Sequence, residues 1–297
     1  MKRLLLLIAV FAVVLAACSG SSSTAATVNG TDVTVGDVEG LFYEIDAEFT
    51  DEQFAGYLNT VIQWTATEQR AETDLDYVPS EEEIDAQVDS ILLESGYEGD
   101  LEAFMSEQNV SEEGLDRFAT QSLIGDAVTE SLTASGEMPT IEDAQQEIDE
   151  NPLESTQVCA SHILVATEEE AQTVTARLDD GEEFAVIAAE VSIDTGSGPA
   201  GGSLGCDTPA RYVPEFAEAT MTATIGVVTD PVGTEFGFHL ILVEDRTLAT
   251  ADQVLVIMEQ TAVSDWMVEA GANADVTVEE EYGTWQSDPP QVIPPAA

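Results

Sequence analysis

The chain has 297 residues, of which 59 are Asp or Glu and only 7 are Lys or Arg, so its formal net charge at pH 7 is −52. Nucleic acid is excluded as a partner, because contacts with phosphates need clustered cations. A net charge of this size keeps a protein soluble, but the like charges repel one another in the compact state, a balance that halophiles use. We therefore hypothesise a saline habitat and an acidic surface exposed to solvent. The length suggests two domains.

The first residues, MKRLLLLIAVFAVVLAACSG, have the layout of a bacterial secretory signal: two cations, an apolar run and small residues before Cys18. The apolar run is shorter than the about 20 residues of a membrane-spanning helix. The segment LAAC resembles a lipobox, which predicts a lipoprotein signal peptide over residues 1–17 and a lipid on Cys18. An ordinary cleaved signal with an incidental cysteine is the alternative. The small residues of 18–26 then form a flexible tether to the cell membrane.

Residues 27–150 are predicted to form a helical domain with one short hairpin. The hairpin turns at Asn29–Gly30, between β-branched residues, and a helix begins near Val35. Apolar residues recur at helical spacing from 51 to about 75. Ser80 with Glu83 three positions later has the pattern of a capping box, and Ser111 caps a later helix. This segment contains no His and no Cys, and its carboxylates follow a solvated helix face, so it carries no catalytic constellation.

Beyond Cys18, two cysteines remain, Cys159 and Cys206. An even pair in an oxidising compartment predicts a disulfide, with two free buried thiols as the alternative. A zinc set formed by these cysteines with His162 and His239 is disfavoured, because Cys159 and His162 are three apart on one strand and face opposite sides of the sheet.

From Val158 the pattern changes to strand, helix, a break at Gly181, helix, a Gly-rich loop, a short helix and a final strand pair. This order predicts an α+β domain around a small antiparallel sheet. The glycine cluster lacks the Lys of a phosphate-binding P-loop and the strand–helix context of a dinucleotide site, so phosphate binding is rejected.

The blocks ASHILV, GEEFAVIAAEVSID, GGSLG, YVPEFAEA and PVGTEFGFHLILVE resemble, in order and spacing, the parvulin (PpiC or rotamase) family of peptidyl-prolyl cis-trans isomerases. The resemblance covers residues 157–246. The helical segment before it, headed by ATVNGTDVT, looks like the chaperone part of SurA/PrsA-type extracytoplasmic foldases. Residues 247–297 look like the tail of such proteins, which docks on the chaperone domain, here followed by a Pro-rich end. The resemblance therefore implies a parvulin domain inserted into one helical module.

The resemblance also assigns the site. It implies a catalytic floor made of His162, Asp194, Thr234 and His239. It places the apolar proline pocket on Leu204, Tyr212 and Phe216, with Phe236 as a fourth substrate-binding residue. Tyr212 stands where a Met is common and Phe236 where other members can have Ser, so the substrate preference is left open. No cluster of Arg or Lys precedes the Gly-rich loop, which argues against selectivity for phosphorylated residues.

The implied function is a peptidyl-prolyl isomerase and foldase that acts on exported unfolded proteins with X–Pro bonds, outside the cytoplasmic membrane and lipid-anchored to it. Rotation about the X–Pro bond is slow, and an apolar pocket can favour the less dipolar twisted form. No metal or cofactor is needed. The alternative is a non-catalytic holdase lipoprotein with a vestigial rotamase domain.

Overall fold

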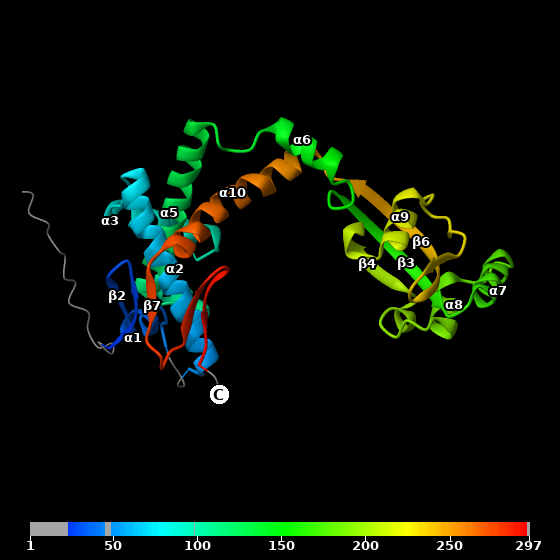
Figure 1. Ribbon diagram of the computed structural model, residues 1–297, viewed down its shortest axis with the longest axis horizontal. Coiled ribbons are helices and arrows are strands. Elements are labelled where there is room, and N and C mark those ends of the chain that lie inside the picture. The colour runs from blue at the N-terminus through cyan, green and yellow to red at the C-terminus, as the bar shows by residue number, and fades with distance from the viewer. Residues whose placement is uncertain (1–22, 45–48, 98, 296–297) are drawn as a thin grey trace, which may run out of the picture. The chain divides into compact units, whose positions relative to one another are not determined.

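The computed structural model describes residues 23–44, 49–97 and 99–295, shown as coloured ribbons in Figure 1. The chain falls into two compact units: the first joins the described residues up to Met138 with Ala262 onward, and the second is Pro139–Thr261. The expected signal peptide, the lipid site Cys18 and residues 18–22 of the tether lie outside the described residues. None of the helices in the described ranges combines the length and apolar character needed to cross a membrane.

The first unit contains a three-stranded sheet built from both ends of the chain. Its strands, in the order β2-β1-β7, are β1 (Thr24–Val28), β2 (Thr31–Thr34) and β7 (Val276–Val278). The first two form the predicted hairpin, whose turn residues Asn29 and Gly30 have positive φ of 49° and 83°. Strand β7 pairs antiparallel with β1, and a second hairpin of β8 (Thr284–Ser287) and β9 (Pro290–Ile293) follows it.

The helices of this unit before Met138 are α1 (Val35–Glu39), α2 (Asp51–Leu75), α3 (Glu81–Glu94), α4 (Leu101–Gln108) and α5 (Glu112–Ser135). The capping box of Ser80 and Glu83 and the cap at Ser111 are present, which confirms the predicted helix starts. Leu58 and Ile62 of α2 are fully buried in one cluster with Val28 of β1 and Val292 of β9. The main core of this unit therefore needs both the N-terminal and the C-terminal segments.

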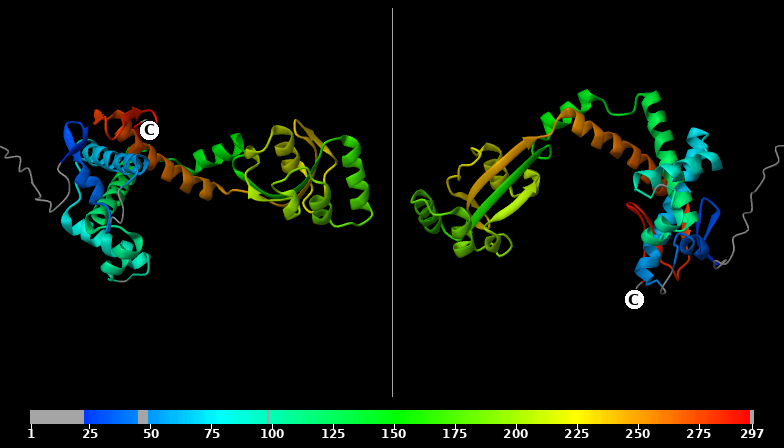
Figure 2. Two further views of the ribbon diagram at one scale, coloured as in Figure 1. Left: turned by 90° about the horizontal axis from the view of Figure 1, so that it is seen from below. Right: turned by 180° about the vertical axis from the view of Figure 1, so that it is seen from behind.

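The second unit centres on a four-stranded antiparallel sheet in the order β4-β3-β6-β5. The strands are β3 (Thr156–Val165), β4 (Ser203–Asp207), β5 (Val232–Thr234) and β6 (Gly237–Leu248). The long strands β3 and β6 lie side by side in its centre, as all the views in Figures 1 and 2 show. The helices are α6 (Ile141–Glu150), α7 (Glu168–Asp179), α8 (Phe184–Val191) and α9 (Pro214–Thr222), with one-turn helices at Gly198–Ala200 and Pro209–Arg211.

Side chains of β3 alternate between two apolar clusters, one on each face of the sheet. Ile163 and Val165 pack with Val174 of α7 and Ile187 of α8. On the other face, Val158 and Ala160 pack with Phe216 of α9. The sheet thus has helices on both faces, and the even-numbered residues of β3 face α9.

The second unit is wider than the segment 157–246 expected from the sequence. Helix α6, expected in the helical domain of residues 27–150, belongs to this unit, because Ala144 and Ile148 pack against Val254. Val254 lies near the start of α10 (Ala251–Asn273), a helix that begins in the second unit and ends in the first. An amphipathic pattern predicts a helix but not its packing partner, which is why the sequence did not separate α6 from the helices before it.

Candidate active site

The two histidines lie on the neighbouring strands β3 and β6, on the same face of the sheet. His239 is paired in register with Leu164, two residues after His162. Both side chains are buried, and their rings are stacked with centroids 5.3 Å apart and planes at 19°. The two Nδ1 atoms are 3.1 Å apart, at hydrogen-bonding distance.

Asp194, in the loop after α8, lies at one end of this pair. Its Oδ2 is 2.8 Å from His162 Nε2, and it also accepts a hydrogen bond from the hydroxyl of Ser197. The N–H of Gly196 donates to the other oxygen. The hydrogen bonds from Ser197 and His162, in that order of importance, hold the pKa of the Asp194 carboxyl well below its usual range. Asp194 is therefore an ionised acceptor at neutral pH.

Thr234 lies at the other end, with its Oγ1 2.8 Å from His239 Nε2. Burial, followed by the charge of His162, lowers the pKa of His239 to about 4, so this ring is neutral at pH 7. Because Asp194 is ionised, His162 donates from Nε2 to its carboxylate. The two Nδ1 atoms share one hydrogen bond, and the neutral His239 ring has one donor and one acceptor nitrogen for His162 and Thr234. The Thr234 hydroxyl also accepts a hydrogen bond from the N–H of Phe236, so the network runs from Asp194 to Phe236.

Apolar side chains cover this floor. The ring of Phe216 stands edge-on to both imidazoles, at 5.7 Å from His162 and 5.2 Å from His239. Leu204 and Tyr212 join Phe216 in one cluster, as the sequence predicts. Phe236 does not: its side chain is 59% exposed. The structure thus brings seven of the eight predicted site side chains together around the histidines and leaves Phe236 exposed beside Thr234.

Ser197 is a member of this network that the sequence did not identify. It is buried, and its Oγ lies 3.0 Å from His162 Nε2 as well as beside Asp194. Its place three residues after Asp194 in a glycine-containing loop is a spacing at which short polar side chains bond each other in turns. That spacing is the only local signal for it, and serine is too common in loops for it to stand out.

The Gly-rich loop is built against the backbone of His162. Gly202 accepts a hydrogen bond from the N–H of His162, and its own N–H donates to the carbonyl of Ser197. Gly202 has φ +84°, and a Cβ there would lie 2.2 Å from the carbonyl oxygen of His162. The glycine at this position therefore allows the loop to hold both Ser197 and β3 in place.

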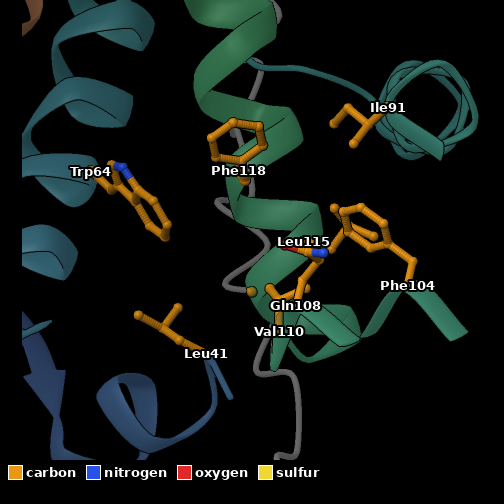
Figure 3. A pocket seen from close by; sticks show the side chains of 9 residues that line it. Leu41, Trp64, Ile91, Phe104, Gln108, Val110, Leu115 and Phe118 are labelled. Carbon is orange, nitrogen blue, oxygen red and sulfur yellow. The ribbon is translucent and has the colours of Figure 1, made fainter. Parts of the chain in front are cut away.

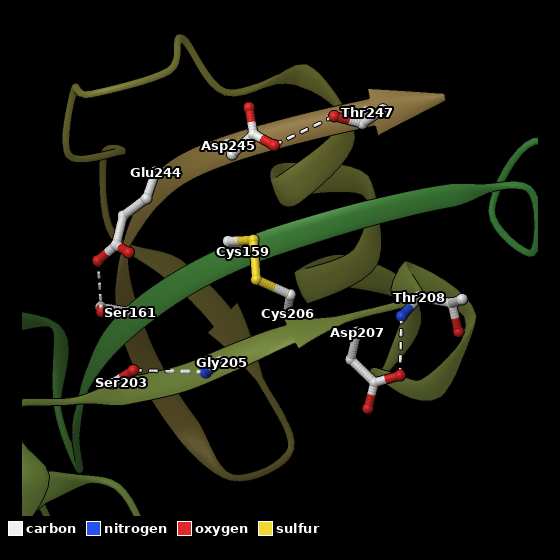
Figure 4. The surroundings of a disulfide bond; sticks show 10 residues. All are labelled: Cys159, Ser161, Ser203, Gly205, Cys206, Asp207, Thr208, Glu244, Asp245 and Thr247. Carbon is white, nitrogen blue, oxygen red and sulfur yellow. Dashed lines mark hydrogen bonds between the residues drawn. A yellow bond between two sulfur atoms is a disulfide. The ribbon is translucent and has the colours of Figure 1, made fainter. Parts of the chain in front are cut away.

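Cys159 and Cys206 are joined by a disulfide, with the sulfur atoms 1.99 Å apart. The two residues face each other in the β3–β4 pairing, and Figure 4 shows the bond between these strands. Because side chains alternate along β3, Cys159 points to the face opposite His162. Next to the bond, β4 has one extra residue, Leu204, between the pairs Ala160–Gly205 and Ser161–Ser203. Within the residues described, no group of three or more His, Cys, Asp or Glu side chains has the arrangement of a metal site.

Comparison with known proteins identifies a family for this part of the chain. Residues 160–245 match the family model described as Rotamase, PPIC-type PPIASE domain. The foldase protein PrsA of Halalkalibacterium halodurans is 34% identical over 205 residues, which are 68% of this chain and 62% of that protein. The foldase protein PrsA of a Geobacillus species (strain WCH70) is 46% identical over 87 residues, 29% of this chain and 32% of that one. The chain thus covers less than two thirds of these curated relatives.

Among solved structures, the peptidylprolyl isomerase PrsA from Bacillus anthracis matches with a TM-score of 0.35 and 23% identity, over 69% of this chain and 88% of that one. PrsA from Bacillus subtilis matches with a TM-score of 0.30 and 25% identity, over 75% and 86%. Residues 160–245 therefore match the PPIC-type PPIase domain family, and the chain is similar to the PrsA foldases over 205 residues.

Proposed function

We propose that this protein is a peptidyl-prolyl cis-trans isomerase and foldase that acts on unfolded, exported proteins outside the cytoplasmic membrane. One observation carries the proposal. Two buried imidazoles are held at both ends by hydrogen bonds and covered by an apolar cluster, inside a segment that matches the rotamase family. Similarity to PrsA foldases over 205 residues supports a role of the whole chain in folding.

The chemistry needs no covalent step. The planar X–Pro amide is more dipolar than the twisted transition state, so a water-poor apolar surface favours twisting. In this proposal, the proline ring binds against Leu204, Tyr212 and Phe216. The floor of His162 and His239 excludes water from this pocket and fixes its shape. Asp194 and Thr234 hold the tautomers of the two rings and therefore the geometry of that floor.

The substrates in this proposal are X–Pro bonds of unfolded polypeptides. Phe236 is exposed beside Thr234, next to the hydrogen-bonded histidines, where a bound polypeptide can contact it. The secretory pattern at the N-terminus and the disulfide, a bond that persists in oxidising compartments, support an extracytoplasmic location with a lipid on Cys18.

An assay of proline isomerisation in a chromogenic tetrapeptide tests the function. His162→Leu and His239→Leu are each expected to slow turnover by about ten- to a hundredfold, because each removes the central hydrogen bond of the floor and misplaces its partner ring. Thr195→Ala, at the exposed neighbour of Asp194, serves as the control and is expected to retain the wild-type rate. Both histidine variants are checked for folding by circular dichroism.

The same assay separates isomerase from holdase. A wild-type chain that does not accelerate isomerisation but still suppresses aggregation of a denatured client would establish the non-catalytic alternative. Folded histidine variants with the full wild-type rate would show that the floor is assigned to the wrong residues.

A further inference from the structure

The first unit contains an apolar pocket of about 240 Å³ among α2, α3, α4 and α5. Figure 3 shows Trp64 of α2, Ile91 of α3, and Leu115 and Phe118 of α5 around it. Leu41, Phe104 and Val110 complete its apolar side chains, and Gln108 is the one polar side chain among the lining residues. Pockets for whole small molecules are usually larger, about 300–1,000 Å³, so this one has the size for a single large side chain.

One side of the pocket is buried, and its edge at Phe118 is exposed to solvent. Phe104 and Leu115 are buried in one cluster with Leu92. Phe118, one turn after Leu115 on α5, is 53% exposed. An aromatic ring left half in water beside an apolar hollow gains free energy when an apolar group covers it. The shape alone does not say which chain would supply that group.

Charge does. Within the described residues of the first unit there are two cations, and both are already paired. Arg70 bonds Asp74 and Glu269, while Arg117 bonds Glu68 and lies over the Trp64 ring.

Carboxylates stand next to the lining residues. Glu113 precedes Gly114 and lies against Gly40, the neighbour of Leu41, and Glu107 precedes Gln108. Near Leu115, burial and then the charges of Glu112, Asp85 and Glu113 raise the pKa of Asp116. The rim of the pocket is therefore negative, without a free cation among the residues described.

We propose that this pocket binds one large apolar side chain of an unfolded polypeptide, at a place where Lys or Arg flanks that side chain. The hollow takes the apolar group, and the carboxylates around it attract the flanking cations while they repel acidic segments. The inference rests on the proposed foldase function for its class of partner, and it adds where and by which chemistry that partner is held.

Fluorescence anisotropy with the full chain and three short proline-free peptides tests it. One peptide carries a Leu flanked by Lys, the second the same Leu flanked by Glu, and the third the Lys residues with Ser in place of Leu. The first is expected to bind best and to weaken as salt is raised, because exposed charges are screened. Leaving out proline lowers any contribution from the histidine site.

Phe118→Ala is expected to weaken binding of the first peptide about fivefold or more, the usual loss for a central contact residue. The matched control is Leu93→Ala, which removes an apolar side chain of similar exposure, 59%, on α3 but outside the pocket lining. It is expected to stay within about twofold of wild type. Circular dichroism melting of both variants shows that they are folded.

Equal binding of the Lys-flanked and Glu-flanked peptides would overturn the charge argument, and an unchanged affinity in folded Phe118→Ala would overturn the pocket. The tetrapeptide assay separates this from the proposed function. A wild-type chain that isomerises proline but binds none of the three peptides refutes only the pocket, whereas one that binds the Lys-flanked peptide without isomerising proline refutes only the enzyme.

Discussion

The carboxylate of Asp194 is the fixed charge at one end of the histidine pair, and Ser197 is the residue that holds it there. The Ser197 hydroxyl contacts both Asp194 and His162, is buried, and makes the largest contribution to the low pKa of Asp194. Ser197 therefore positions the floor without belonging to the surface proposed for the proline ring.

Ser197→Ala is expected to lower the free energy of unfolding by about 1–2 kcal/mol near neutral pH, the cost of removing one partner of a buried hydrogen bond. The folded-state pKa of Asp194 lies below its ordinary value of 3.8, so its contribution to stability is present above that pH and is lost as the pH falls through the folded-state value. The variant loses part of this contribution, so the difference from wild type should shrink as the pH falls below about 4. Urea unfolding at a series of pH values measures it.

Thr195→Ala is the control, since Thr195 is an exposed neighbour in the same loop. A Ser197→Ala difference that stays constant across the acid range would mean that Ser197 supports the loop by packing and does not act through Asp194.

At the scale of helices and strands, the sequence predicts those features that residues close together in the chain determine. The Asn29–Gly30 turn and the Ser80 cap form as expected because the residues that specify them lie within a few positions of each other. The pairing of β7 with β1 was not predicted strand by strand, since Val276–Val278 is too short to show a pattern and its partner is at the other end of the chain. For the site, the resemblance identifies the histidines and Asp194, whereas Ser197 becomes evident only from its contacts.

The disulfide fastens the edge strand β4 to β3 beside the extra residue Leu204, which belongs to the apolar cluster over the histidines. It closes a loop with a sequence separation of 47, worth on the order of 4 kcal/mol in the chain-entropy model. Reduction is therefore expected to lower the melting temperature and to loosen Leu204, with a smaller loss of isomerase activity than either histidine variant shows.

The double variant Cys159→Ser with Cys206→Ser is the control and should melt at the same temperature with and without reductant. Mass spectrometry of non-reduced peptides from protein collected outside the cytoplasmic membrane provides the direct check. Two free thiols there would contradict the bond.

At the scale of the whole molecule, the first unit is assembled from both ends of the chain, and the second unit is inserted between them. Val292 and Ala270 from the C-terminal part are buried with Leu58 of α2. Val263 and Trp266 of α10 pack with Leu132, near the end of α5, in one cluster. The segments on either side of the second unit thus pack on one cluster of the first unit.

This arrangement predicts that residues 139–261 can be replaced by a short Gly/Ser linker without loss of the first unit. One end to be joined follows helix α5, and the other, Ala262, lies inside α10, which loses its first part in the deletion. Leu132 of α5 and Val263 of α10 pack on the same cluster, so the linker adds little closure entropy. The deletion protein should show a cooperative helical melt and should still bind the Lys-flanked peptide at the Phe118 pocket. A second deletion that also removes 262–297 is the control and should be unfolded, because it exposes the cluster around Leu58 and leaves β1 without β7. If the first deletion were unfolded as well, the two chain ends could not form a unit without the isomerase domain between them.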